Sequence, residues 1–331
     1  MRFYQKGNKI MLVFGPIPSR RLGQSLGVNN IPPKACSYSC IYCQIGRTTN
    51  MRINRKKFYE PLEVYSLVQS KVKQLQEYEK KLDYISFVPD GEPTLDKNLG
   101  TELDLIKELN IKTAVITNAS LLWMDDVKED LSKADWVSVK IDAVWDDVWH
   151  KINRPHGGLS LKNILDSIIN FSKSYKGNLV TETMLVSGFN DDLQHIEGIA
   201  EQISKINPRK SYLLVPTRPP AEKNISRVTG EKLIQAAGII NSISGVDVEC
   251  ITADDTEQGF FFTDNIVKDL LSITSVHPIR EEIIKHYFKL VKADSSILQE
   301  LIKQNKIIRC TYQGKTFYKK NLLFFNKKDS L

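Results

Sequence analysis

Apolar and polar positions follow two different periods along most of the chain. Short apolar runs with β-branched residues predict strands at residues 23–30, 83–88, 112–117, 136–141, 179–186 and 211–215. Apolar positions spaced three or four apart predict helices at residues 99–110, 125–133, 161–174, 191–206 and 230–243. Regular alternation of strand and helix is typical of an α/β fold with a parallel sheet.

A different pattern begins near residue 260. Helical spacing predicts three helices, at 264–274, 279–291 and 295–305. Two strands at 307–312 and 315–319 then flank Gln313-Gly314, a hairpin signal. Three helices followed by a β-hairpin resemble a winged helix. We therefore expect two domains, residues 1–260 and a winged-helix-like domain at 261–331.

Composition narrows the class of protein. The chain has 331 residues, 41% hydrophobic and 26% charged, which excludes disordered and collagen-like proteins. It has no stretch of 18 apolar residues, and its first residues lack the apolar core of a signal peptide. We expect a cytoplasmic protein that does not contact a membrane, and in that reducing compartment five cysteines do not predict a disulfide framework.

Charge is distributed unevenly. Residues 1–60 contain eleven Lys/Arg and one acid, residues 61–263 contain 22 basic and 31 acidic residues, and residues 264–331 contain thirteen basic and seven acidic residues. Basic ends can attract polyanions, but a charge run alone favours a solvated lysine surface. Nucleic acid is therefore a candidate partner.

Three cysteines lie close together, with the spacing C-x3-C-x2-C: Cys36, Cys40 and Cys43. Three thiolates in one short loop suit an iron–sulfur cluster. A structural zinc would need a fourth ligand, and the loop contains no other Cys or His. Buried thiols or a zinc site are the alternatives. The isolated Cys250 and Cys310 are expected to be ordinary buried thiols.

The cysteine motif, with Tyr42 before its last cysteine, resembles the signature of radical S-adenosylmethionine (SAM) enzymes. In that superfamily three cysteines hold a [4Fe-4S] cluster, and the remaining iron binds the amino and carboxylate groups of SAM. An electron from the cluster cleaves SAM to methionine and a 5′-deoxyadenosyl radical, which abstracts hydrogen from a substrate. The resemblance implies a partial (β/α)6 TIM-type barrel, both cofactors, and an external electron donor such as flavodoxin or ferredoxin.

Two later segments extend the resemblance. After the second predicted strand, Gly91, Glu92 and Pro93 resemble the superfamily's GGE motif, which holds the SAM amino group; Asp90 replaces its first glycine. After the third strand, Asn118 is a candidate contact for the SAM carboxylate or ribose, or else the N-cap of the next helix.

The fourth predicted strand also ends in polar residues. Lys140 and Asp142 share one face of it and would suit a carboxylate and a ribose diol, or form a structural ion pair. In the loop beyond, Arg154 is a candidate ligand for a carboxylate or phosphate. His156 is either a general acid or simply exposed.

The loops after the fifth and sixth strands complete the candidate site. Val186 and Asn190 belong to a segment that resembles the superfamily's Val-x-Gly-x-Asn-Asp segment near the adenine of SAM. Asn190 or Asp191 is alternatively the cap of the next helix. The loop at residues 218–222 is expected to meet the substrate.

Residues 13–260 as a whole resemble a bacterial and archaeal subgroup of iron–sulfur oxidoreductases related to the tRNA wyosine-base synthase. That synthase carries a second cluster on further N-terminal cysteines, and none precedes Cys36 in this sequence, which argues against wyosine synthesis. Three hypotheses follow: a radical SAM enzyme acting on RNA, in particular tRNA; a radical SAM activase or modifier of a protein or peptide; and a cluster-bearing regulator that binds nucleic acid.

Overall fold

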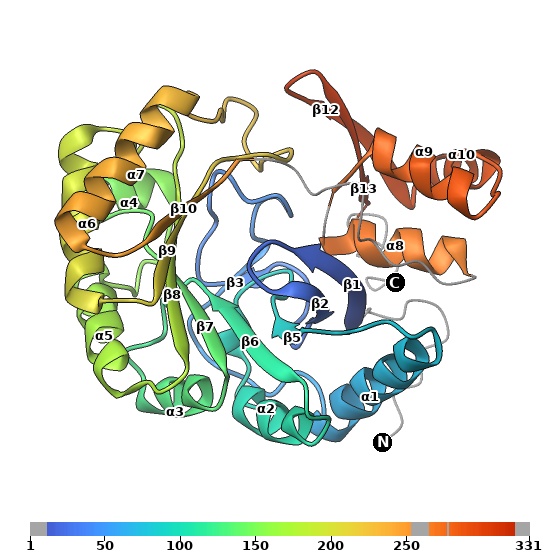
Figure 1. Ribbon diagram of the computed structural model, residues 1–331, viewed down its shortest axis with the longest axis horizontal. Helices are drawn as coiled ribbons and strands as arrows, with labels where there is room; N and C mark the ends of the chain where they lie inside the picture. Colours follow the sequence, from blue (N-terminus) through green and yellow to red (C-terminus); the bar gives the residue numbers. More distant parts are fainter. Residues whose placement is uncertain (1–11, 253–264, 277, 322–331) are drawn as a thin grey trace.

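The computed structural model describes residues 12–252, 265–276 and 278–321. Its main feature is an eight-stranded sheet of order β1-β2-β5-β6-β7-β8-β9-β10. The strands are β1 (Val13–Ser19), β2 (Gly23–Val28), β5 (Tyr84–Phe87), β6 (Lys112–Thr117), β7 (Trp136–Lys140), β8 (Asn178–Met184), β9 (Lys210–Leu214) and β10 (Val248–Ile251). Neighbours from β2 to β10 run parallel, and β1 runs antiparallel to β2. Figure 1 shows the sheet curving into an open, partial barrel.

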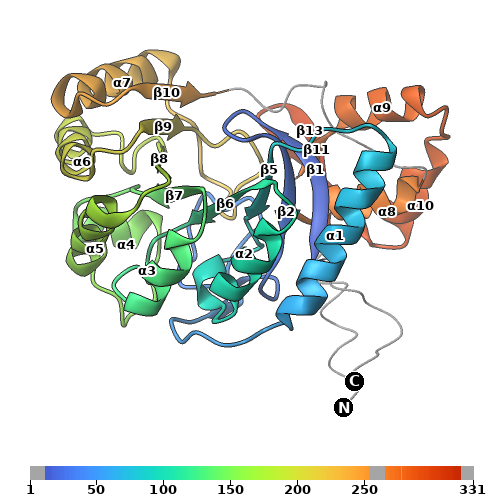
Figure 2. The same cartoon turned by 60° about the horizontal axis from the view of Figure 1, so that its bottom comes forward.

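Helices cover the outer side of the curved sheet (Figures 1 and 2). They are α1 (Pro61–Glu77), α2 (Leu99–Lys107), α3 (Asp125–Ser132), α4 (Asp146–Ile152), α5 (Leu161–Ser174), α6 (Leu193–Ile206) and α7 (Gly230–Ser244). In α6, Ile196, Ile199 and Ile203 form a buried stripe at helical spacing. Asp192 is the N-cap of this helix, and its carboxylate accepts hydrogen bonds from the backbone N–H groups of Gln194 and His195. The predicted α/β fold with a parallel sheet is confirmed.

Four elements of the barrel were not predicted: β1, β10, α1 and α4. Strand β1 contains Pro16 and Pro18, which mask the strand pattern but are tolerated because β1 is an edge strand. Strand β10 adds a seventh parallel strand to the six expected, and all four of its residues are half-buried, so it shows no alternation. Helix α1 did carry a signal, a buried stripe from Val64 through Val68 and Val72 to Leu75.

Beyond residue 264 lies a smaller group of elements, here called the C-terminal unit. It comprises α8 (Ile266–Val276), β11 (Ile279–Arg280), α9 (Glu281–Leu290), α10 (Ser296–Lys303), β12 (Ile307–Tyr312) and β13 (Lys315–Lys320). The hairpin is confirmed, with positive φ at both Gln313 and Gly314. The helix predicted over 279–291 was wrong at its start, because Ile279 and Arg280 pair with β13. The predicted boundary at 260/261 lies outside the described residues.

The C-terminal unit has its own hydrophobic cluster, separate from that of the barrel. Tyr287, Leu301 and Ile307 are among its buried members, and Ile17 of β1 packs against them. The unit also reaches the barrel mouth, since the Tyr312 hydroxyl lies 3.3 Å from the carbonyl oxygen of Pro216. Strand β1 and the loop after β9 therefore join the unit to the barrel.

Glu102 of α2 is a carboxyl group buried in the barrel wall, with no exposed surface. Its neighbour Asn30 has a side-chain oxygen without a donor among the described residues. Burial, and then the nearby Asp96, raise the pKa of Glu102. A protonated carboxyl can donate to the Asn30 oxygen, which an ionised one cannot do. We infer that Glu102 is neutral in the folded protein.

Replacing Glu102 by Gln is expected to stabilise the protein, increasingly as pH rises. A folded-state pKa above the unfolded value means that folded Glu102 holds its proton more tightly, so wild-type stability falls as pH rises from about 4.5. The glutamine variant lacks this loss, and the difference grows by up to about 1.4 kcal/mol per pH unit. Urea denaturation at several pH values measures it. Exposed Glu129→Gln is the control, and parallel curves for both variants would contradict the inference.

Candidate functional site

The three cysteines lie on a loop that is fixed at both its ends and its middle. Strand β3 (Ala35–Cys36) pairs with β4 (Asn50–Met51) and closes the loop. Along it, the Ser39 N–H donates to the carbonyl of Asn153 at 3.0 Å, and the Ile41 N–H donates to that of Ile152 at 3.0 Å. The segment that ends α4 therefore holds the cysteine loop in place.

One side-chain amide faces each of two cysteine sulfurs. Asn153 Nδ2 lies 3.4 Å from Cys40 Sγ, and Asn118 Nδ2 lies 3.7 Å from Cys36 Sγ. Burial raises the pKa of all three thiols, that of Cys40 to about 12. Buried thiols become thiolates when a metal binds them, and N–H donors then stabilise the sulfur charge. This donor set fits an iron–sulfur cluster.

A single metal ion is a poorer fit for the described residues. Among them, no three His, Cys, Asp or Glu side chains converge closely enough to hold one ion. Zinc needs its ligands within about 2.0–2.3 Å of one point. A four-iron cluster is wider and receives its cysteines at separate corners.

Gly91, Glu92 and Pro93 form the layer beneath the cysteine loop. A Cβ on Gly91 would overlap the carbonyl oxygen of Ala35, so only glycine permits this close approach. The Glu92 carboxylate accepts hydrogen bonds from the Thr117 hydroxyl at 2.6 Å and the Asn118 N–H at 2.8 Å. This motif therefore ties the ends of β5 and β6 to the cysteine loop.

A second polar network lies on the other side of the loop. The Tyr42 hydroxyl donates to Asp142, and Asn153 Nδ2 donates to the same carboxylate at 2.8 Å. Lys140 Nζ lies 3.6 Å from Asp142 Oδ1 and 5.2 Å from the centre of the Tyr42 ring. Lys140 and Asp142 thus form the ion pair that the sequence left as an alternative, and Asn153 joins it to Cys40.

A cavity of about 410 Å³ opens inside the barrel at the carboxyl ends of its strands. Of the predicted residues it includes Tyr42, Cys43 and Lys140. Arg218, from the loop expected to meet the substrate, also lines it, and the polar lining residues that the sequence analysis did not select include Arg21, Ser86, Asp90 and Glu182. The carboxyl ends of barrel strands are where active sites of this architecture lie.

Arg21 and Glu182 form an ion pair within the cavity wall. Ser138 also donates to Glu182, at 2.6 Å. Burial opposes ionisation of this carboxyl, but Arg21 and Lys140 outweigh it and lower the pKa of Glu182. A charged residue in the middle of an otherwise buried strand was the sequence signal for Glu182.

The other predicted residues do not line the cavity: Cys36, Cys40, Gly91, Glu92, Pro93, Asn118, Asp142, Arg154, Val186 and Asn190. Arg154 forms a surface ion pair with Glu222, which also pairs with Arg47. Asn190 is fully buried and bonds only backbone groups: it accepts from the Val186 N–H and donates to the carbonyls of Asp142 and Met184, all at 2.8–2.9 Å.

Replacing Asn190 by Ala is expected to lower the free energy of unfolding by about 2–4 kcal/mol, because three buried backbone groups lose their partner. SAM affinity of the folded, cluster-loaded variant should stay unchanged. Urea denaturation and equilibrium dialysis measure the two quantities, with exposed Asn163→Ala of α5 as the control. Wild-type stability combined with lost SAM affinity would instead make Asn190 a SAM ligand.

Comparison with known proteins gives consistent results. The family model described as the radical SAM superfamily matches residues 30–203. A UPF0026 protein of Methanocaldococcus jannaschii is 42% identical over 311 residues, covering 94% of this chain and 96% of that protein. A UPF0026 protein of Synechocystis is 34% identical and covers 72% of this chain and 95% of its own length.

Solved structures share the fold. A structure of TYW1 with a lysine–pyruvate adduct bound aligns with a TM-score of 0.53 at 18% identity, over 71% of this chain and 77% of that one. A radical SAM methyltransferase from Sphaerobacter thermophilus aligns with a TM-score of 0.52 at 15% identity, over 70% and 67% of the two chains. At these identities the likeness is one of fold.

Proposed function

The chain belongs to the radical SAM superfamily and to the UPF0026 family, and from that premise we propose that it cleaves SAM reductively in order to modify RNA. In this proposal Cys36, Cys40 and Cys43 hold a [4Fe-4S] cluster. Membership of this family shows that the chain is a radical SAM enzyme, which gives its catalytic class. The substrate and the cluster itself are the proposed parts.

The observation that carries the proposal is the position of the cysteine loop. Its three cysteines are half-buried, two of them face amide donors, and Cys43 borders the barrel cavity. A bound cluster would supply the electron that cleaves SAM to methionine and a 5′-deoxyadenosyl radical. Because the cavity borders Cys43, the same space could receive both SAM and the substrate.

The polar residues around the loop divide into two groups in this proposal. Tyr42, Asn118 and Lys140 contact SAM, since Tyr42 and Lys140 line the cavity and Asn118 adjoins Cys36. Of the other predicted SAM residues, Gly91, Glu92 and Asp142 position these three and the cysteine loop through the contacts described above. Pro93 accepts a hydrogen bond from Asn30 Nδ2 at 3.2 Å, Arg154 pairs with Glu222 at the surface, and Val186 and Asn190 bond each other within the barrel wall. The lysine cation suits the carboxylate of SAM.

We further propose that residues 261–331 form a winged-helix-like domain that contacts RNA. The element order α8-β11-α9-α10-β12-β13, with sheet order β11-β13-β12, supports this assignment. Thirteen basic against seven acidic residues in 264–331 give the segment the charge expected of a nucleic-acid-binding module. Tyr312 at the tip of the hairpin reaches the loop after β9, which places the hairpin beside the cavity mouth.

The decisive experiment is anaerobic. Cluster-loaded protein is reduced with dithionite, or with flavodoxin or ferredoxin as the proposed physiological donor, and incubated with SAM. Formation of 5′-deoxyadenosine, increased by added RNA, is the expected result. If only added protein increases 5′-deoxyadenosine formation, and deuterium passes from a labelled protein into 5′-deoxyadenosine, the chain is an activase. If the cluster is intact but SAM is not cleaved under any of these conditions, the cluster-bearing regulator is the hypothesis that remains.

Among the described residues, no helix is long and apolar enough to cross a membrane.

A further inference from the structure

Asp90 is a buried carboxyl group in the lining of the barrel cavity. It lies just beyond strand β5, in the position where the superfamily's GGE motif has its first glycine. Other polar lining residues have partners within the protein: Arg21 pairs with Glu182, and Ser25 hydrogen-bonds Ser86 at 2.7 Å. Asp90 is only 3% exposed, yet its Oδ1 has no hydrogen-bond partner among the described residues. A buried carboxyl oxygen without a partner in a cavity wall indicates a place for a donor from a ligand.

Backbone hydrogen bonds hold Asp90 in place. Its N–H donates to Asn29 Oδ1 at 3.1 Å, and its carbonyl oxygen accepts from the Lys34 N–H at 2.6 Å. Lys34 lies two residues before Cys36, so the second bond ties Asp90 to the start of the cysteine loop. Asp90 and Cys43 also line the same cavity. A polar group that the fold already holds can bind a ligand without the entropic cost of ordering it.

The surroundings of Asp90 make its negative charge costly. Burial raises the pKa of Asp90 to about 7, although the nearby Lys320 and Lys34 lower it. An N–H group of a ligand that donates to this carboxylate would offset the cost of burial. An ammonium group would be repelled by the two lysines, so a neutral amino group is the better match.

We propose that Asp90 accepts a hydrogen bond from the exocyclic amino group of a base of the substrate, an inference that rests on RNA being the substrate class proposed above. Adenine, cytosine and guanine carry such an amino group, whereas uracil has carbonyl oxygens instead. A carboxylate attracts an amino group and repels a carbonyl oxygen. Asp90 would therefore make the cavity select a base with an amino group and reject uracil.

Apolar residues of the same cavity suit the faces of a base. Phe14, Val88 and Met184 line the cavity together with Asp90. A nucleobase has flat apolar faces and a polar edge, and protein sites for single bases commonly stack the faces on apolar or aromatic side chains. A base can therefore pack against these residues while its edge reaches the carboxylate.

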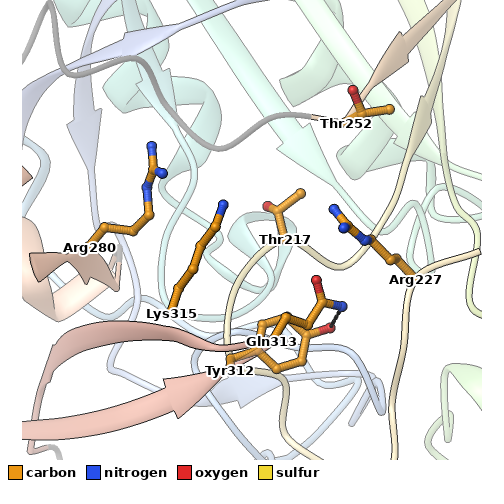
Figure 3. Close-up of a pocket in the computed structure, with 7 residues that line it drawn as sticks. All are labelled: Thr217, Arg227, Thr252, Arg280, Tyr312, Gln313 and Lys315. Atoms are coloured by element: carbon orange, nitrogen blue, oxygen red, sulfur yellow. Dashed lines mark hydrogen bonds between the residues drawn. The ribbon is translucent and has the colours of Figure 1, made fainter. Parts of the chain in front are cut away.

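The cavity also leaves room for a substrate longer than one nucleotide. It adjoins a second pocket, of about 300 Å³, because Thr217 lines both spaces. Figure 3 shows Thr217 between Lys315 of the β12–β13 hairpin and Arg227. A polynucleotide with one base at Asp90 can extend from the cavity into the space between the barrel and the hairpin.

The test compares short labelled oligonucleotides that differ at the amino group. Oligocytidylate is paired with oligouridylate, and oligoadenylate and oligoguanylate are each paired with oligoinosinate, whose base lacks the amino group. Fluorescence anisotropy measures their binding to cluster-loaded protein with SAM. The proteins are wild type, Asp90→Asn and, as matched control, Asp146→Asn, which makes the same change at an exposed aspartate of α4 outside the cavity.

Wild type is expected to bind at least one amino-bearing oligonucleotide about tenfold more tightly than its counterpart. Asp90→Asn should lose this preference, because an amide donates as well as accepts hydrogen bonds. Asp146→Asn should keep it. Equal binding within every pair by wild type, or an unchanged preference in Asp90→Asn, would overturn the proposal.

Two further measurements separate a base contact from other roles of Asp90. Urea denaturation should show that Asp90→Asn is at least as stable as wild type, since Oδ1 bonds no group within the described structure. A loss of stability would instead assign Asp90 a structural role and overturn the proposal. Equilibrium dialysis should show unchanged SAM affinity. Lost SAM affinity with the base preference retained would make Asp90 a SAM ligand.

The proposed function and the base contact fail in different ways. If wild type binds none of the oligonucleotides and no RNA increases 5′-deoxyadenosine formation, RNA is the wrong substrate class and both proposals are wrong. If RNA increases 5′-deoxyadenosine formation but Asp90→Asn keeps the base preference, only the assignment of Asp90 is wrong. If Asp90→Asn loses the base preference but wild type never cleaves SAM, the proposed reaction is wrong and the base contact stands.

Discussion

Replacing Cys40 by alanine is expected to abolish 5′-deoxyadenosine formation. A cluster held by three cysteines already has one iron without a protein ligand, and removing a second ligand leaves it too weakly bound to persist. Iron and sulfide per chain should fall toward zero together with the activity. The measurement is the anaerobic SAM-cleavage assay, with cluster content determined on the same sample.

The chain provides matched controls for this variant. Cys250 and Cys310 are also half-buried thiols, but they lie outside the cysteine loop. Cys250→Ala and Cys310→Ala should keep wild-type cluster content and activity. In the cluster-free state, the free energy of unfolding of Cys40→Ala should lie within about 1 kcal/mol of the wild-type value, because only one small side chain changes. Wild-type cluster content in Cys40→Ala would exclude the proposed ligand set.

Replacing Gly91 by alanine is expected to destabilise the protein by about 2–4 kcal/mol and to reduce cluster incorporation. The added Cβ would overlap the Ala35 carbonyl oxygen and lie 2.8 Å from Ile31 Cδ1. Backbone carbonyl atoms cannot rotate away as a side chain can. The strain would therefore displace Ala35, the residue directly before Cys36, which the proposal makes a cluster ligand.

The control for this prediction is a glycine with free space around it. A Cβ on Gly238 of α7 meets no atom within 4 Å, so Gly238→Ala should stabilise the protein by about 0.5–1 kcal/mol. Urea denaturation of the cluster-free variants gives the stabilities, and iron content after reconstitution gives the second readout. Equal behaviour of the two variants would show that the approach of Gly91 to Ala35 does not position the cysteine loop.

The strands and helices with strong periodicity were predictable because each is encoded in adjacent residues. Strands β5 to β9 and helix α6 follow their patterns closely. Two strands were not predicted. Prolines conceal the strand pattern in edge strand β1, and uniform half-burial conceals it in β10. The start of α9 was predicted wrongly because Ile279 pairs with Tyr318, which lies on a strand nearly forty residues later in the chain.

Within the site, the sequence was most informative where the chemistry is local. Spacing alone selected Cys36, Cys40 and Cys43, and the order of elements placed them at the carboxyl ends of the strands. It could not separate cavity residues from supporting ones. Lys140 lines the cavity, whereas Asn190 holds backbone groups inside the wall. Both are polar residues after a strand, and only burial and hydrogen-bond partners distinguish them.

By itself the sequence determined the fold class, the cysteine motif and the radical SAM family, since these depend on short-range period and spacing. The tertiary structure decided the rest through contacts between residues far apart in the chain. It paired Arg21 with Glu182, attached Asn153 to Cys40, and joined Arg227 to Lys315 around one pocket. Such contacts leave no local pattern, because they arise only when the sheet curves and brings its loops together.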